Sequence, residues 1–120
     1  MEIRFGQQTS GGGGGSSIEV ESFVFTDDTH MVIGPIGSVP ESTSDTLVFW
    51  GPILLLLTTD YTIRPVAGGS APGYYICVAT NSSAPGGGTF SGGSNPTTGM
   101  AAFIQASDKI TFQYQPAVAP

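Results

Sequence analysis

The sequence has few charged residues, and basic residues are the scarcest of them. Charged residues make up 10% of the 120 residues, against roughly a quarter in an average soluble domain. The three cations, Arg4, Arg64 and Lys109, are too few and too scattered to form the basic cluster that phosphate backbones require. With nine acidic residues, the net charge is -6 at pH 7. We therefore expect no nucleic-acid partner.

The sequence also contains only one cysteine and one histidine. Cys77 has no second cysteine with which to form a disulfide within the chain. Its place in a strand-like run, Tyr-Tyr-Ile-Cys-Val, favours a small buried side chain over a nucleophile or a metal ligand. His30 has no nearby residues in sequence that would complete a Ser-His-acid triad or a zinc site. The sequence therefore predicts no enzyme activity.

Two pairs of acidic residues are the remaining candidates for a metal site. Glu19, Glu21, Asp27 and Asp28 could supply oxygen ligands to a hard cation. Their spacing matches no calcium-binding loop, and adjacent aspartates are typical of a turn. We expect no metal site and no cofactor.

No apolar run is long enough to cross a membrane as a helix, and the N-terminus has no signal-peptide pattern. The most apolar stretch, Thr46–Arg64, is interrupted by Gly51-Pro52, which helices and strands rarely continue through. On either side lie Leu47–Trp50 and Ile53–Leu57, whose aromatic and β-branched residues favour paired buried strands. We predict that this stretch forms the core, and we expect no membrane partner.

Short alternating segments separated by Gly, Pro and Asp turns predict an all-β domain over residues 18–114. The first, Ile18–Thr26, places Val20 and Val24 on one face and Phe23 on the other. Further strands are expected at 30–33, 74–80, 100–105 and 109–114. The predicted fold is an antiparallel β-sandwich, Ig-like or jelly-roll-like, of about seven or eight strands. Residues 115–120 predict an extended C-terminal tail.

Residues 1–17 predict an extended N-terminal arm. Ile3 and Phe5 alternate around Arg4, and residues 11–17 are all Gly or Ser, which is the composition of a flexible linker. One interpretation is a tail and its hinge. The other, which we favour, is an arm that docks its Ile3–Phe5 segment onto another subunit, with Ile3, Arg4 and Phe5 as partner-binding residues.

The segment 81–98 predicts a long irregular loop. It is rich in Gly and Pro, and Phe90 is its only large apolar residue. A loop of this length in a small domain is often functional, so we expect it to face solvent or a neighbour and to tolerate insertions at residues 86–88. Phe90 is a further candidate partner-binding residue.

Three short blocks resemble a β-sandwich module of tailed-bacteriophage virion surface proteins, a group that includes capsid decoration proteins, head fibres and tail fibres. The blocks are Thr46–Phe49, Asp60–Ile63 and Ser107–Tyr114, in the family's order. Trp50-Gly51-Pro52 stands where the family has Asn-Gly, and an insertion separates the second block from the third. The resemblance implies a β-sandwich fold and a virion context, and it identifies no binding site.

The resemblance leaves three functions open. The first is a capsid decoration or cement protein, the second a tail fibre or tail adaptor component, and the third a receptor- or glycan-binding module that uses residues 81–98. We favour decoration, because one short domain with its own start methionine lacks the long repetitive shaft of a fibre. The expected partners are then other virion proteins, first the major capsid protein, and further copies of the chain. By analogy with other phage surface proteins we expect a trimer, made in the host cytoplasm and located on the virion surface.

Overall fold

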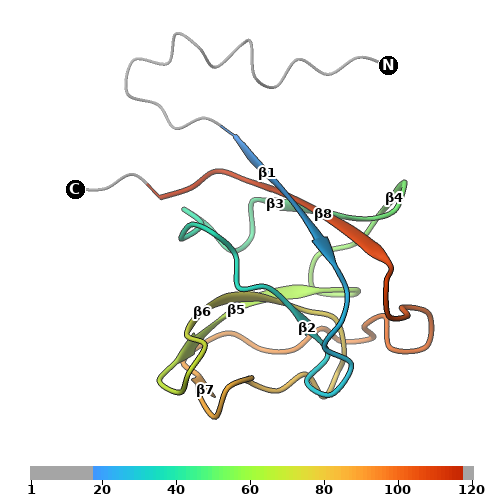
Figure 1. The fold of residues 1–120 in the computed structure, drawn as a ribbon. Helices are drawn as coiled ribbons and strands as arrows, with labels where there is room; N and C mark the ends of the chain where they lie inside the picture. Colours follow the sequence, from blue (N-terminus) through green and yellow to red (C-terminus); the bar gives the residue numbers. More distant parts are fainter. Residues whose placement is uncertain (1–17, 118–120) are drawn as a thin grey trace, which may run out of the picture.

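The computed structural model describes residues 18–117 and shows an all-β architecture with no helix in this range. The strands are β1 (Glu19–Val24), β2 (Val32–Ile33), β3 (Thr46–Trp50), β4 (Ile53–Leu54), β5 (Thr62–Ala67), β6 (Gly73–Cys77), β7 (Thr89–Phe90) and β8 (Lys109–Tyr114). They form two antiparallel sheets of four strands, one above the other in Figure 1. The predicted antiparallel β-sandwich is confirmed. The predicted arm, with Ile3, Arg4 and Phe5, lies outside the described residues, as does the end of the predicted tail.

The first sheet has the strand order β1-β8-β3-β4. In its middle, Phe112 on β8 lies opposite Glu21 on β1 and Val48 on β3. β3 and β4 form a hairpin whose turn is Gly51-Pro52. Gly51 has a φ of 59°, a left-handed conformation that glycine adopts without strain. The predicted strand–turn–strand is therefore confirmed.

The second sheet has the order β2-β6-β5-β7 and is covered on both faces. Ile33, Ile76 and Ile63 lie side by side across β2, β6 and β5 and point into the space between the sheets. On the opposite face, Val32 and Cys77 belong to a separate buried cluster. Part of the segment 81–98 packs on that cluster.

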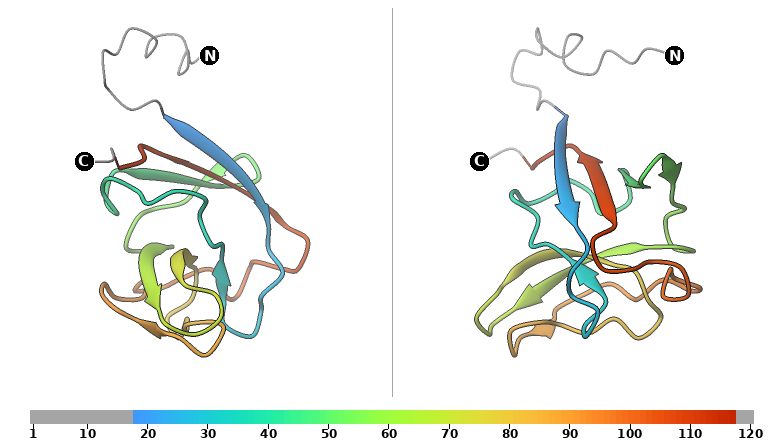
Figure 2. Two further views of the ribbon diagram at one scale, coloured as in Figure 1. Left: turned by 60° about the vertical axis from the view of Figure 1, so that its left-hand side comes forward. Right: turned by 45° about the vertical axis from the view of Figure 1, so that its right-hand side comes forward.

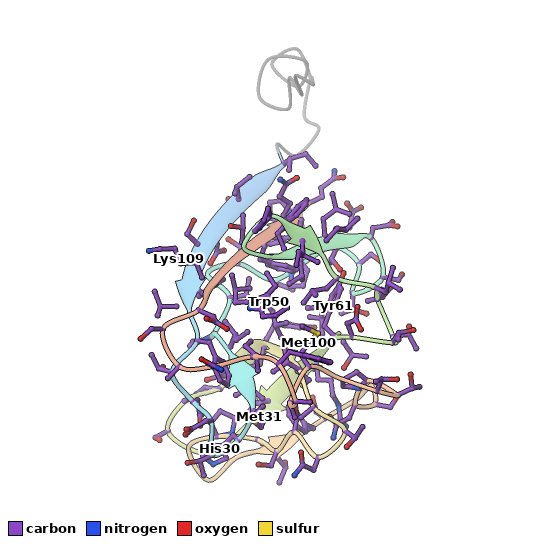
Figure 3. The ribbon with its side chains drawn as sticks, turned by 90° about the vertical axis from the view of Figure 1, so that its right-hand side faces the viewer. His30, Met31, Trp50, Tyr61, Met100 and Lys109 are labelled. Carbon is purple, nitrogen blue, oxygen red and sulfur yellow. The ribbon has the colours of Figure 1, made fainter. Side chains whose placement is uncertain are left out.

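The main core fills the space between the two sheets. The rings of Phe112 and Tyr114 stack with their centroids 4.7 Å apart. In Figure 3, Trp50, Tyr61 and Met100 lie between the two layers. The largest fully buried side chains of the described region are Tyr61, Tyr114, Phe25, Phe112, Ile76, Ile110, Val48, Val78 and Cys77. Tyr61 belongs to the core and the half-buried Trp50 packs against it, as predicted for the stretch Thr46–Arg64.

The prediction that Thr46–Arg64 forms the core is wrong for four of its eleven apolar residues, which are exposed. Val48 and Leu55 are buried, but Leu47, Leu54 and Leu56 are 42%, 48% and 59% exposed. Leu47 and Leu54 point to the outer face of the first sheet, and β4 is a two-residue strand at the edge of that sheet. At an edge, a side chain that points away from the core has no neighbouring strand beside it to cover it.

Two further sequence expectations are corrected by the structure. Residues 100–105 form turns and not the first strand of a hairpin with β8, because Ile104 N–H donates to the Met100 carbonyl at 2.8 Å. His30 and Met31 lie in a turn before β2, and Met31 has a φ of 57°, which a strand residue does not adopt.

The segment 81–98 is more ordered than the predicted loop. It contains β7, and Asn95 Nδ2 donates to the carbonyls of Thr80 and Ser82, each at 3.0 Å. Pro85 and Pro96 are buried. Part of the segment therefore covers the second sheet, while most of its residues are exposed, as expected of a loop that faces solvent or a neighbour.

Candidate interaction surface

The outer face of the first sheet is uncovered, and it carries exposed apolar side chains on both sides of the polar outer face of β8, Lys109, Thr111 and Gln113. Val20 and Val24 on β1, Leu47 on β3 and Leu54 on β4 are 42–53% exposed. The register places them on one face, around the half-buried Thr111 in the middle of the sheet. No described segment covers this face as residues 81–98 cover the second sheet. Exposed apolar side chains gathered on one uncovered face are typical of a protein-binding surface.

A shallow hollow lies on this face between β1 and β8. It has a volume of about 120 Å³ and is lined by Ser22, Phe23, Val24, Lys109, Ile110 and Thr111. Lys109 points away from the body of the molecule (Figure 3). The hollow has room for one apolar side chain of a partner, and it lies on the side of β1 that pairs with β8.

The acidic residues of β1 point away from this surface, toward the inside of the sandwich. Tyr114 Oη lies 2.5 Å from Glu21 Oε2 and 3.1 Å from Glu19 Oε1. Having one proton, the hydroxyl donates to one carboxylate at a time, and it accepts from Ser38 N–H at 3.2 Å. Gly37 N–H also donates to Glu21. Both carboxylates therefore have hydrogen-bond partners inside the sandwich, and the side chains on the outer side of β1 carry no charge.

The pKa of Tyr114 is raised, first by burial and then by its hydrogen bond to the Glu21 carboxylate. Both effects favour the neutral phenol, because an ionised phenolate would lose solvation and face two carboxylates. Tyr114 therefore remains a donor at all physiological pH values, and it holds the loop at Ser38 against β1.

Side-chain hydrogen bonds connect the segments 46–50, 56–61 and 107–114, which contain the three sequence blocks described above. Tyr61 Oη lies 2.8 Å from Thr46 Oγ1 and donates to the Thr46 carbonyl at 3.0 Å. Trp50 Nε1 donates to Asp108 Oδ2 at 2.9 Å. Asp60 Oδ2 accepts from Leu56 N–H at 2.8 Å and closes the turn after β4. The blocks are thus adjacent in space as well as ordered in sequence.

His30 and Asp27 form a hydrogen-bonded pair, and His30 lies at the end of the sandwich away from this surface (Figure 3). His30 Nδ1 lies 2.9 Å from Asp27 Oδ2, and Asp27 Oδ1 accepts from the backbone N–H groups of Thr29 and His30. Burial alone would raise the pKa of Asp27, but the hydrogen bonds and the charge of His30 outweigh it, so the pKa lies below its ordinary value of 3.8. The pair stabilises the turn that precedes β2.

This pair leads to a prediction about acid stability. A carboxyl group whose pKa is lower in the folded than in the unfolded protein stabilises the fold at pH values above its unfolded pKa. This stabilisation is lost as the pH falls through the folded pKa. We expect Asp27→Asn to lower stability at neutral pH and to make unfolding less dependent on pH below about 4. Urea unfolding between neutral and acidic pH measures this, with Asp28→Asn as the control that removes the same charge from the exposed neighbour. Equal pH profiles for the two variants would contradict the role of the pair.

Cys77 and Phe90, two further residues considered from the sequence, both lie on the second sheet. Cys77 is fully buried, and burial raises its pKa to about 12, as expected for a small core side chain. Phe90 on β7 is half-buried, and the Arg64 guanidinium lies over its ring at 4.1 Å. Arg64 also donates to Asn95 Oδ1 at 2.9 Å. Arg64 therefore covers one side of the Phe90 ring, and the partner-binding role of Phe90 stays a prediction.

A second hollow, of about 190 Å³, lies beside β5. It is lined by Thr43, Ser44, Leu57, Thr58, Thr62, Ile63, Gly93 and Ser94. Its lining contains no ionisable side chain that could orient a charged ligand. Within residues 18–117, no group of three or more His, Cys, Asp or Glu side chains is placed to hold a metal ion, and no helix has the length and hydrophobicity needed to cross a bilayer.

The outer face of the first sheet is thus the most prominent candidate site in the described structure. Comparisons with protein-family models, curated proteins and solved structures find no match. Sequence analysis separated the two faces of β1, but it did not identify this surface, because Leu47 and Leu54 were assigned to the core. The alternation of Leu47 with Val48 was the only available sign that one of them points outward.

Proposed function

We propose that this chain is a structural protein of a bacteriophage virion, a decoration or cement protein that attaches to the outside of the capsid and stabilises it. The observation that carries the proposal is the set of exposed apolar side chains on the uncovered outer face of the first sheet, which are Val20, Val24, Leu47 and Leu54. Such a face suits burial against another protein. Contacts of this kind reinforce a shell through buried area and not through a few surface ion pairs.

The arrangement of the three virion-like blocks supports the proposal. Thr46–Phe49 lies in β3 and Ser107–Tyr114 contains β8, and these strands are paired. Tyr61 of the second block is hydrogen-bonded to Thr46 of the first. The blocks therefore form one structural unit, as is expected of a module that shares its fold with virion surface proteins. Its proposed partners are the major capsid protein and further copies of the chain, in a trimer by analogy with other phage surface proteins.

The direct test of the proposal is to determine how many copies of this protein a virus particle carries and where they lie. Mass spectrometry of purified particles gives the copy number, and a reconstruction at side-chain resolution gives the position. Hundreds of copies on the shell would support decoration. Density confined to the tail would overturn decoration and favour a tail fibre or tail adaptor component. Absence from the particle would overturn the virion proposal altogether.

A separate prediction concerns the N-terminal arm, residues 1–17. A chain that begins at Ile18 is expected to keep the fold, because the two sheets and their core lie within residues 18–117, and to lose binding to the capsid. Circular dichroism measures the first effect and co-sedimentation with undecorated particles the second. The full-length Ile3→Ser/Phe5→Ser variant controls for chain length. Full occupancy by the shortened chain would show that the arm is not the attachment element, and failure to fold would show that it belongs to the core.

A further inference from the structure

The first sheet has a long free edge along β1. β1 pairs with β8 on one side, and no strand of residues 18–117 pairs with its other side. It borders the upper sheet in both views of Figure 2. β1 has six residues, whereas the edge strands β2, β4 and β7 have two each. An unpaired edge of this length is a template for pairing with another strand.

The hydrogen bonds at the end of β1 show which backbone groups face the free edge. Phe25 N–H donates to the Asp108 carbonyl, and Ser107 N–H donates to the Phe25 carbonyl, both at 2.8 Å. In an extended strand, the backbone groups of successive residues point to alternate sides. Phe25, Phe23 and Glu21 therefore direct their groups toward β8. The N–H and C=O groups of Val20, Ser22 and Val24 point to the free edge.

We propose that two copies of the chain associate through this edge, β1 against β1, antiparallel about a two-fold axis at Ser22. In this register Ser22 lies opposite Ser22 of the partner subunit, and Val20 lies opposite Val24 of the partner subunit. All three residues that direct backbone groups to the free edge then form hydrogen-bonded pairs. The two four-stranded sheets become one sheet of eight strands.

The side chains favour a second copy in this register. The outward side chains of β1 are Val20, Ser22 and Val24, so a second β1 brings no charge against them, and the valines form cross-strand apolar pairs. On the inner side, Glu21 lies opposite Phe23 of the partner subunit. A register shifted by one residue on each strand would place Glu21 opposite Glu21 of the partner subunit, and like charges directly opposite are destabilising.

The extent of the edge sets the strength of the contact. Two paired six-residue strands bury less than the roughly 1,200 Å² of a stable interface. The association is therefore weak in dilute solution and becomes effective where copies are held side by side, as on a shell. A two-fold contact of this kind is compatible with a trimer formed through another surface. The inference does not rest on the proposed function, and its test uses the isolated full-length chain.

Disulfide trapping tests the register. Cys77 is fully buried, so an introduced cysteine is the one reactive thiol of the described region. Under mild oxidation, Ser22→Cys is expected to give a covalent dimer, because hydrogen-bonded pairs have Cα atoms about 5.5 Å apart, within disulfide range. Val20→Cys is the matched control on the same edge. In the proposed register, Val20 of the partner subunit is offset from Val20 by four residues along the strand, about 13 Å at about 3.3 Å per residue. The Val20→Cys variant should therefore remain uncrosslinked.

Charge substitution tests the same contact by sedimentation. Val20→Lys/Val24→Lys places lysines opposite each other in both cross-strand pairs, whereas Val20→Lys/Val24→Glu places Lys opposite Glu in both. We expect the dimer dissociation constant of the first variant to be about tenfold higher than that of the second. Net charge predicts the opposite order, because two added lysines reduce the charge of -6 and with it the general repulsion.

Several results would overturn the proposal. Equal cross-linking of Ser22→Cys and Val20→Cys would indicate random collision, and no cross-linking of a folded Ser22→Cys would exclude the register. Equal association of the two charge variants would place the contact elsewhere. A wild-type monomer at every concentration, with the Val20, Ser22 and Val24 amides protected from hydrogen exchange, would mean that another segment of the same chain covers the edge.

Discussion

Replacing Phe112 by alanine is expected to lower the free energy of unfolding by about 3–5 kcal/mol. Phe112 is fully buried at the centre of β8, and its ring stacks on Tyr114. The strands on both sides, β1 and β3, contribute to the site that its ring fills. Removing the ring leaves a cavity that the two flanking strands can close only by moving. Because small domains have a total stability of about 5–15 kcal/mol, this variant should be close to unfolded at physiological temperature.

The fluorescence of Trp50, the only tryptophan, reports this unfolding during a urea titration. Phe103→Ala is the matched control, because it makes the same chemical change at a side chain that is 59% exposed. Its free energy of unfolding should stay within about 0.5 kcal/mol of the wild-type value. Similar losses in both variants would contradict the assignment of β8 to the centre of the core.

The sequence was most informative where a strand has one buried and one polar face. In β8, Ile110, Phe112 and Tyr114 alternate with Lys109, Thr111 and Gln113, and the structure buries the first set. The alternation alone predicts the strand and its inner face. In the same way, the Gly51-Pro52 pair predicted the turn between β3 and β4, because few residues other than glycine adopt its left-handed conformation.

The sequence was less informative where burial depends on position within the sheet. The run Ile53–Leu57 is continuously apolar, and hydrophobicity alone cannot show that β4 is a two-residue edge strand. The same holds for the free edge of β1. Its existence follows from the pairing of β1 with β8, about 90 residues later in the chain, and no local pattern encodes which side of a strand is left unpaired. The candidate surface was therefore only partly predictable.

The segment 81–98 shows a related failure, because its composition hides tight packing. Gly and Pro are typical of a free loop, but glycine is also required where two backbones approach closely. A Cβ atom at Gly88 would lie 2.7 Å from Val66 Cγ1 and 2.8 Å from the Gly68 carbonyl oxygen. Close packing against β5, and not flexibility, thus explains this glycine.

Gly88→Ala is accordingly expected to lower the free energy of unfolding by about 1–3 kcal/mol, since the added methyl group must displace Val66 or the backbone at Gly68. Gly92→Ala is the matched control from the same segment. A Cβ atom there has no neighbour within 4 Å, and the residue does not have a left-handed φ. This control should match or slightly exceed wild-type stability, because alanine reduces the entropy of the unfolded chain. Thermal and urea unfolding of the two variants measure the difference. Equal stability would show that residues 86–88 do not pack on the second sheet and would restore the free loop that the composition predicts.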